Sequence, residues 1–372
     1  MVEVDPTLTV GARTMPPHET CFADWAVVAH KDDTGFGRMA ADARKVLGFG
    51  HHFVIPSERL KDHPVDGTTE KWLAKDAPEE LVRALLAEVR GIVFFERHSW
   101  HPALLRIARE MGVATVCVPM WEWFNGDAPE WRDCDLFVCP TRFTESVVRS
   151  YGFKNTAVLP WAVDLEKFAP RRISGPARQF VHNAGLVDHD DRKGTRDTIR
   201  AFRKVGREDV RLLVRMQIAT ELPDLDDRIE VRVGNLGSAS DLYATGDVCI
   251  QPSKMEGLGF MVLEPACCGI PVITTDYPPM NEFILQPEMR CATRWFKRKA
   301  YARQWIRHAH LKLPSIPDLA RRIEWAASND MAGISEGNRS WAETVFEPGS
   351  LVRTWSDTLL PLHKHRPAAH RP

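Results

Sequence analysis

Residues 252–275 read PSKMEGLGFMVLEPACCGIPVITT, and the interpretation of the whole chain starts from this stretch. Short apolar runs at 247–250 and 271–274 predict two buried strands. The glycine-containing segment between them predicts a loop that opens into a helix of about ten residues. Two parallel strands joined by a helix form a compact βαβ unit, so the chain should belong to the α/β class.

Two glycines, Gly257 and Gly259, stand where this loop turns into the helix. Backbone can approach a ligand closely at glycine, and the free N–H groups at a helix start attract phosphate. Glu256 precedes the glycines, and Glu264 follows about two helical turns later, where it can point toward the same helix end. Carboxylates repel phosphate, so we expect them to accept hydrogen bonds from hydroxyl groups beside it. The pattern therefore favours a sugar nucleotide as ligand.

The same residues resemble the signature of the family 4 (group 1) retaining glycosyltransferases of the GT-B fold. The resemblance implies that Glu256 contacts the donor sugar and Glu264 the ribose. It also implies that four backbone amides bind the diphosphate, those of Gly257, Leu258, Gly259 and Phe260. Pro265 replaces the family's usual alanine and predicts that the helix starts late, near Gly259 or Phe260. For either glutamate taken singly, a solvated helix residue without a functional role is the alternative.

The length of 372 residues suits two α/β domains. The GT-B resemblance implies two doubly wound, Rossmann-like domains that face each other across a cleft. We expect the first, on the acceptor side, at 1–168 together with a C-terminal crossing helix at 350–364. The donor-binding domain should occupy 169–349, and 365–372 should form a disordered tail.

The charge and cysteine patterns exclude several classes of protein. With 49 basic and 50 acidic residues, no global field favours nucleic acid or an anionic membrane. The eight cysteines are scattered without C-x-x-C pairs, which indicates reduced thiols and a cytoplasmic protein. The start of the chain has no signal-peptide pattern, and no apolar run is long enough to span a bilayer. A soluble protein is expected, or one that is peripheral on the inner membrane face.

A rival hypothesis comes from the segment 30–38, which is predicted to be a glycine loop between a strand at 25–29 and a helix at 39–47. Gly35, Gly37 and Ala40 spell the G-x-G-x-x-A pattern of a nicotinamide dinucleotide site, and Glu58 follows at a suitable distance. However, the dinucleotide motif places its first glycine at the strand end, and here several residues intervene. In the glycosyltransferase interpretation, Gly35, Gly37 and Arg38 approach the donor phosphate or the acceptor.

Two loops of the first domain should line the cleft, at 96–101 and 119–123, because each follows a predicted parallel strand. The family often carries a histidine in the second loop that touches the donor sugar, but this chain has Glu122 and no histidine there. His98, His101 and Glu122 are the candidates to replace it, and a loop residue without catalytic duty is the alternative for each. The D-x-D pattern at 133–135 leads directly into a strand, so no metal site is expected.

The second domain contains Lys193 in a charged loop before a predicted helix at 195–205. The resemblance implies that Lys193 and an arginine neutralise the diphosphate, but Leu186 stands at the arginine's position. Arg192 or Arg215 could supply the second cation, or it is missing. The family's nucleobase contact corresponds to backbone near Leu236. The sequence thus predicts metal-independent, retaining transfer from a UDP-, GDP- or similar sugar, without a cofactor; an inactive sugar-nucleotide binding module is another alternative.

The segment from Arg290 to Lys312 holds eight basic residues, interleaved aromatics and no acid. Burial of eight unpaired cations is prohibitive, so we expect an exposed face. An amphipathic helix or an aromatic hairpin fits the pattern. The hypothesis is that this face binds an anionic acceptor, such as a lipid phosphate, an acidic polysaccharide or a nucleic acid, against the alternative of a solvated insertion.

Overall fold

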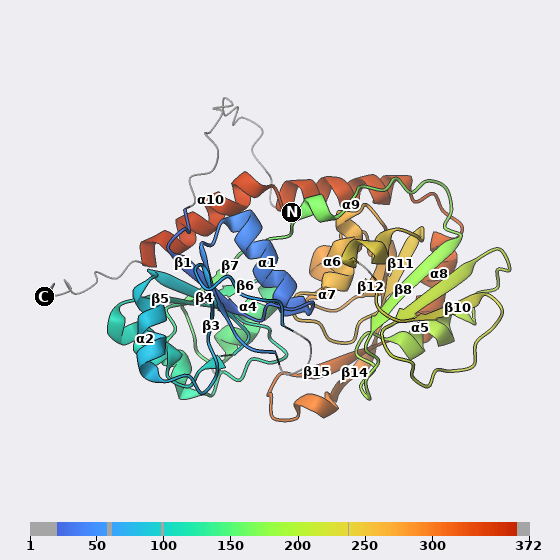
Figure 1. The fold of residues 1–372 in the computed structure, drawn as a ribbon. Coiled ribbons are helices and arrows are strands. Elements are labelled where there is room, and N and C mark those ends of the chain that lie inside the picture. The colour runs from blue at the N-terminus through green and yellow to red at the C-terminus, as the bar shows by residue number, and fades with distance from the viewer. Residues whose placement is uncertain (1–20, 58–61, 98–99, 237, 363–372) are drawn as a thin grey trace, which may run out of the picture.

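The computed structural model describes residues 21–57, 62–97, 100–236 and 238–362, which form two domains around two parallel sheets (Figure 1). Glu58, His98 and the predicted tail at 365–372 lie outside the described residues. The α/β class and the doubly wound architecture are confirmed.

Seven strands form the first sheet in the order β3-β2-β1-β4-β5-β6-β7. The strands are β1 Trp25–Ala29, β2 His51–Val54, β3 Glu70–Trp72, β4 Gly91–Phe95, β5 Ala114–Val118, β6 Leu136–Cys139 and β7 Thr156–Val158. Helices α1 Gly35–Leu47, α2 Glu79–Ala87, α3 Leu104–Met111 and α4 Arg142–Ser150 connect them. Every residue of β1, β4, β5 and β6 is buried, which explains why these strands read as continuous apolar runs rather than alternating ones.

Six strands form the second sheet in the order β10-β9-β8-β11-β12-β13. They are β8 Gln179–Gly185, β9 Arg211–Met216, β10 Ile229–Val233, β11 Val248–Gln251, β12 Val272–Thr275 and β13 Arg290–Cys291. The main helices of this domain are α5 Thr195–Phe202, α6 Phe260–Cys267, α7 Met280–Phe283 and α8 Ile316–Ala326. The βαβ unit around residues 252–275 is therefore β11-α6-β12, as the sequence predicts.

The chain ends with α9 Ala332–Val345 and α10 Pro348–Leu359, and α10 lies along the first domain beside α1 (Figure 1). Its Trp355 indole donates a hydrogen bond of 3.1 Å to the carbonyl of Pro160. The same ring meets Trp161 edge-on at 5.7 Å and Phe49 at 6.5 Å. The crossing helix that the GT-B resemblance implies is thus anchored by an apolar contact and a hydrogen bond.

The predicted glycine loop at 30–38 is wrong in its second half, because α1 begins at Gly35 and includes Gly37 and Arg38. Thr34 caps this helix by accepting a hydrogen bond from the Gly37 amide. A Cβ atom at Gly37 would lie 1.9 Å from the carbonyl oxygen of Asp32, so only glycine fits this tight entry. The cap and the close approach override the low helix propensity of the two glycines.

Most of the basic segment forms an antiparallel hairpin of β14 Thr293–Lys299 and β15 His310–Pro314. The connection between the two strands contains a short 3-10 helix at Tyr301–Arg303. In Figure 1 this orange hairpin lies between the two domains, at the lower edge of the view. Buried Ala300, Ile306 and Ala309 pack with Trp121 and Val147 of the first domain. Of the two structures that the sequence left open, the hairpin is the one observed.

The expectation of uncompensated cations on this segment is partly wrong. Arg298 lies 3.4 Å from Asp190, and Arg307 lies 3.8 Å from Asp127. Arg303 is only 8% exposed and stacks on Trp123 at 4.0 Å. Acids elsewhere in the chain supply partners that the local sequence lacks, so a local count of charges overstates the free charge.

The eight cysteines all lie within the described residues and are free thiols, and only Cys21 is exposed. Burial raises the pKa of most of these thiols, for example that of Cys249 to about 12. Among the described residues, no helix has the length and apolar character needed to cross a membrane.

Candidate active site

The amino end of α6 lies at the meeting point of the two domains. The helix begins at Phe260 with Gly259 as its N-cap, which confirms the late start predicted from Pro265. A Cβ atom at Gly257 would lie 2.7 Å from a carboxylate oxygen of Glu122 and 2.8 Å from the sulfur of Met120. Gly257 thus lets the second domain approach the loop after β5 of the first domain.

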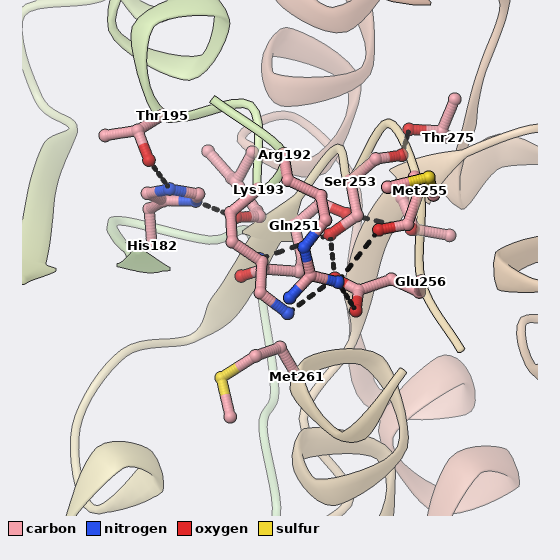
Figure 2. A network of polar contacts seen from close by, with 12 residues as sticks. His182, Arg192, Lys193, Thr195, Gln251, Ser253, Met255, Glu256, Met261 and Thr275 are labelled. Carbon is pink, nitrogen blue, oxygen red and sulfur yellow. Dashed lines mark hydrogen bonds and ion pairs between the residues drawn. The ribbon is translucent and has the colours of Figure 1, made fainter. Parts of the chain in front are cut away.

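Glu256 lies at the centre of a buried polar network (Figure 2). One carboxylate oxygen accepts hydrogen bonds from Lys193 at 2.6 Å and from Ser253 at 2.7 Å. The other accepts from Arg192 at 2.8 Å. The backbone carbonyl of Glu256 accepts a hydrogen bond of 2.5 Å from the Trp121 indole. Contacts from both domains therefore fix this glutamate.

The two cations set the ionisation of Glu256. Burial alone would raise the pKa of this carboxyl, but Lys193 and Arg192 lower it to about 2. Glu256 is therefore a carboxylate at neutral pH, with two positive charges beside it. A buried cluster with one net positive charge next to a helix amino end favours an anion.

A second ionic cluster holds the loop that carries Arg192 and Lys193. The buried ammonium of Lys254 lies 3.0 Å from Asp191 and 2.9 Å from Asp197. The amide of Lys254 also donates to the carbonyl of Arg192 at 2.8 Å. The loop before α5 is thus tied to the segment that contains Glu256, which keeps both cations in place.

Of the two candidates for the family's missing arginine, the structure brings Arg192 to the site. Arg215 instead donates to the carbonyl of Leu242 at 2.6 Å and to Thr245 at 2.8 Å. Leu186, at the position of the family's arginine, is exposed. Because of these two hydrogen bonds, Arg215 is a structural residue.

Leu236 is exposed as well, and it follows the edge strand β10 of the second sheet.

Glu264 is buried about one turn into α6. Its carboxylate accepts a hydrogen bond of 2.5 Å from the Tyr243 hydroxyl and forms an ion pair with Arg38 of the first domain. The Arg38 guanidinium also lies 5.3 Å from the Phe260 ring centroid. The predicted donor-side residues Arg38, Phe260 and Glu264 thus meet across the cleft.

The first domain contributes two buried carboxyl groups, those of Glu96 and Glu122. Each follows a strand, β4 or β5, at the carboxyl edge of the sheet where ligands bind in open α/β folds. Glu96 has φ 63, an uncommon left-handed conformation for a residue with a side chain. Burial and the neighbouring Glu122 raise the pKa of Glu96 to about 8, and burial raises that of Glu122. One oxygen of Glu122 is buried without a hydrogen-bond partner among the described residues.

Other residues of the predicted cleft loops have structural contacts. His101 is buried, with Nε2 2.9 Å from the carbonyl of Ala77 and Nδ1 accepting from the Ala103 amide. Both ring nitrogens are engaged, so His101 does not replace the family's histidine. Trp123 contacts Arg97 at 4.9 Å and Arg303 at 4.0 Å.

The D-x-D pattern lies away from this site. Asp135 precedes β6, at the opposite edge of the sheet, and accepts hydrogen bonds from the amide and hydroxyl of Thr115. Asp133 pairs with Arg109 at 2.5 Å. Within the described ranges, no cluster of three or more histidine, cysteine or carboxyl side chains is arranged to hold a metal ion.

Sequence reasoning missed three residues of this site: Glu96, Tyr243 and Arg303. Glu96 stands directly after a predicted strand, in the loop at 96–101 that was expected to line the cleft, and this position was a usable signal. Tyr243 and Arg303 reach the site through tertiary packing and carry no local motif.

The second domain matches a known family. Residues 178–307 match the model of the family described as Glycosyl transferases group 1. The matched residues make up about a third of the chain, so the second domain is similar to the group 1 glycosyl transferases. Together with the two facing parallel sheets and the crossing helix, this places the chain among GT-B proteins.

A curated relative of this chain is a GDP-mannose-dependent alpha-(1-6)-phosphatidylinositol dimannoside mannosyltransferase of Mycobacterium tuberculosis, 30% identical over 180 residues. The match covers 42% of this chain and 45% of the relative, so the chain spans about half the length of the curated relatives it matches.

Two solved structures have the same fold over nearly the whole chain. Anabaena HepE in complex with UDP and glucose has a TM-score of 0.65 at 12% identity. The match covers 91% of this chain and 99% of the HepE chain. A Rickettsia africae glycosyltransferase has a TM-score of 0.66 at 14% identity, with 92% and 98% covered.

Proposed function

We propose that this chain transfers a sugar from a nucleoside diphosphate sugar to an acceptor hydroxyl, with retention of configuration and without a bound metal ion. The convergence of Lys193 and Arg192 on Glu256, beside the amino end of α6, carries the proposal. It places two fixed cations, a carboxylate and a helix start within one buried cluster. A dinucleotide site at Gly35 is less well supported, because Gly37 serves the tight helix entry.

In this proposal the diphosphate binds at the amides of Gly257 to Phe260, next to Lys193 and Arg192. Glu264, about one turn along α6, accepts hydrogen bonds from the ribose hydroxyls. Arg38 holds Glu264 when no donor is bound and moves to the diphosphate when one is. The base lies toward Leu236.

The reaction breaks the bond between the anomeric carbon and the diphosphate oxygen, and the diphosphate leaves with the electron pair. The acceptor oxygen bonds to the same carbon and gives its proton to the departing diphosphate. Lys193, Arg192 and the helix amides stabilise the negative charge that grows on the leaving group. Two fixed cations supply the charge that a metal ion supplies in other transferases.

Glu256 and Glu122 would hold the transferred sugar from opposite sides. Glu256 belongs to the second domain, and Glu122 lies against Gly257 from the first. The free carboxyl oxygen of Glu122 is suited to a sugar hydroxyl, as donor or acceptor of a hydrogen bond, and it would take the place of the family's histidine.

For the substrates, the name of the curated relative suggests GDP-mannose as donor and a glycosylated phospholipid as acceptor. A lipid phosphate is one of the anionic acceptors that the basic segment predicts. Such an acceptor would bring the protein to the inner membrane face as a peripheral protein.

Screening nucleotide sugars for thermal stabilisation and turnover tests the proposal. GDP-mannose and UDP-glucose should be compared, and the anomeric configuration of the product read by NMR. Stabilisation and turnover by one donor, with retention, is the expected result. Stabilisation without any turnover would indicate a sugar-nucleotide binding module instead, and binding of NAD in place of nucleotide sugars would indicate an oxidoreductase.

A further inference from the structure

A pocket of about 370 Å³ lies between helix α4 of the first domain and the β14–β15 hairpin of the second. We propose that this pocket, which we call the hairpin pocket, binds the phosphate-bearing headgroup of the acceptor. The inference rests on the proposed transfer reaction and specifies its acceptor. The volume falls within the range of pockets for small polar ligands, roughly 300–1,000 Å³.

Lys297 is the charged side chain that lines the hairpin pocket, together with the imidazole rings of His308 and His310. No acidic residue lines it among the described residues. The nearby carboxylate of Glu282 already accepts the amide hydrogens of Arg142 and Phe143, at 2.8 and 2.9 Å. The pocket is therefore suited to an anion.

The register of the hairpin strengthens this argument. Lys297 stands directly opposite Lys312 on the partner strand, and both ammonium groups lie near the Tyr277 ring, at 5.1 and 5.8 Å. Like charges directly opposite each other destabilise an antiparallel pair. A bound phosphate would offset this repulsion, which gives the unfavourable pairing a function.

Other cations of the hairpin serve different roles. Arg298 faces Asp190, and Lys299 donates to the carbonyls of Ile306 and Arg307. Arg307 contacts Asp127 and the Tyr151 ring. Lys297 is therefore the lysine of β14 that is directed to the pocket.

Aromatic rings from both domains form the walls of the hairpin pocket. Phe143 meets Trp121 edge-on at 5.0 Å and Tyr277 at 6.0 Å. Such walls suit the apolar face of a ring that carries hydroxyl and phosphate groups. The Trp121 indole also donates to the carbonyl of Glu256, so the pocket adjoins the donor site. A headgroup bound there would present its hydroxyls toward the transferred sugar.

Lys297→Gln and Arg294→Gln form a matched pair for the test. Both residues are exposed and both variants remove one positive charge from β14, but Lys297 lines the pocket and Arg294 does not. The full chain is titrated with glycerophosphoinositol and with inorganic phosphate. Loss of one charged hydrogen bond should weaken the binding of glycerophosphoinositol to Lys297→Gln about tenfold, and Arg294→Gln should stay within about twofold of wild type. Equal effects of the two variants, or none, would overturn the proposal.

The choice of probe separates the possible sources of the phosphate. Tighter binding of glycerophosphoinositol than of inorganic phosphate supports a lipid headgroup, and equal affinities with the same dependence on Lys297 support the phosphate group alone. Vesicles of phosphatidylcholine, with and without phosphatidylinositol, form the third probe. Vesicle binding that depends equally on both residues, without binding of the soluble probes, would contradict the pocket, because diffuse surface charge explains it.

A donor titration of the same variants separates the two proposals. A wild-type protein that binds no nucleotide sugar would contradict the proposed function. Normal donor binding, together with a headgroup affinity that is unchanged in Lys297→Gln, would contradict only the proposal for the hairpin pocket.

Discussion

The donor half of the cleft is built from residues that lie close together in the sequence, whereas the other half combines distant segments. Glu256, the amides up to Phe260 and Glu264 all belong to one loop and the helix that follows it. On the other side, Glu96 and Glu122 follow two separate strands, and Arg303 arrives from a hairpin of the second domain. The first half can therefore be recognised from a sequence motif. The second half forms only where segments that are distant in the sequence come together in the fold.

The difference also appears in the ionisation of the two halves. Cations hold the pKa of Glu256 at about 2, while burial raises the pKa of Glu96 to about 8. The donor half therefore presents fixed charges, whereas burial in the other half favours the neutral form of both carboxyl groups. The following predictions test this contrast.

The largest effect is expected for Lys193→Ala. Removal of a fixed cation from the leaving group should lower turnover by about two to three orders of magnitude, with a smaller loss of donor affinity. Steady-state kinetics with the donor found in the screen measure both. Arg196→Ala is the control, because the Arg196 guanidinium donates to the backbone carbonyl of Asp188 in the same loop, at 3.4 Å, and it should remain near wild type. Equal kinetics in the two variants would remove Lys193 from the mechanism.

The next effect concerns Glu96, whose pKa is about 8 in the folded state against an ordinary value of 4.5. Between these values the folded protein binds more protons than the unfolded chain, so stability falls as pH rises from about 5 to 8 and levels off above. Glu96→Gln should therefore gain stability relative to wild type across this window, by roughly a few kcal/mol.

Urea unfolding of wild type and Glu96→Gln at several pH values measures this gain. Glu122 contributes in the same direction, so some pH dependence should persist in the variant. If the difference in unfolding free energy between wild type and Glu96→Gln does not change with pH, Glu96 is ionised throughout this pH window.

Glu256→Gln should have a moderate effect. Loss of the charge on a group that contacts the donor sugar should lower turnover roughly ten- to hundredfold and leave nucleotide affinity nearly unchanged. The readouts are turnover and titration with free nucleoside diphosphate. An affinity loss as large as the turnover loss would move Glu256 from the sugar to the nucleotide.

The smallest effect is expected from a chelator. Lys193, Arg192 and the helix amides supply the positive charge, so turnover in the presence of EDTA should remain within about twofold. Loss of activity with EDTA that magnesium or manganese restores would contradict metal independence.

Local patterns were sufficient for the α/β class, the βαβ unit and the start of α6. They did not predict α9, whose sequence contains two glycines and little apolar periodicity. Tertiary hydrogen bonds hold this helix: Asn338 donates to the carbonyl of Ile270, and Arg339 donates to those of Phe168 and Cys267. The edge strand β3 was missed for a similar reason, since buried Glu70 is stabilised by Lys31 and Arg44.

For the site, the sequence named Glu256, Glu264, Lys193 and Glu122, and the structure brings these residues to one cleft. The choice between Arg192 and Arg215 needed the structure, because both are basic residues of the same domain. The structure was also needed to identify the partners of Arg307 and Arg298, because Asp127 and Asp190 are far from these arginines in the sequence. The roles of all these residues remain predictions.

Titration calorimetry of UDP and GDP against wild type and Glu264→Ala tests the central claim most directly, that this cleft is a nucleotide-sugar donor site. The account predicts that wild type binds one of the two nucleotides. It also predicts that Glu264→Ala binds it more weakly by about 1–3 kcal/mol, because charged hydrogen bonds to the ribose are lost. Failure of wild type to bind either nucleotide, or unchanged affinity in Glu264→Ala, would contradict it.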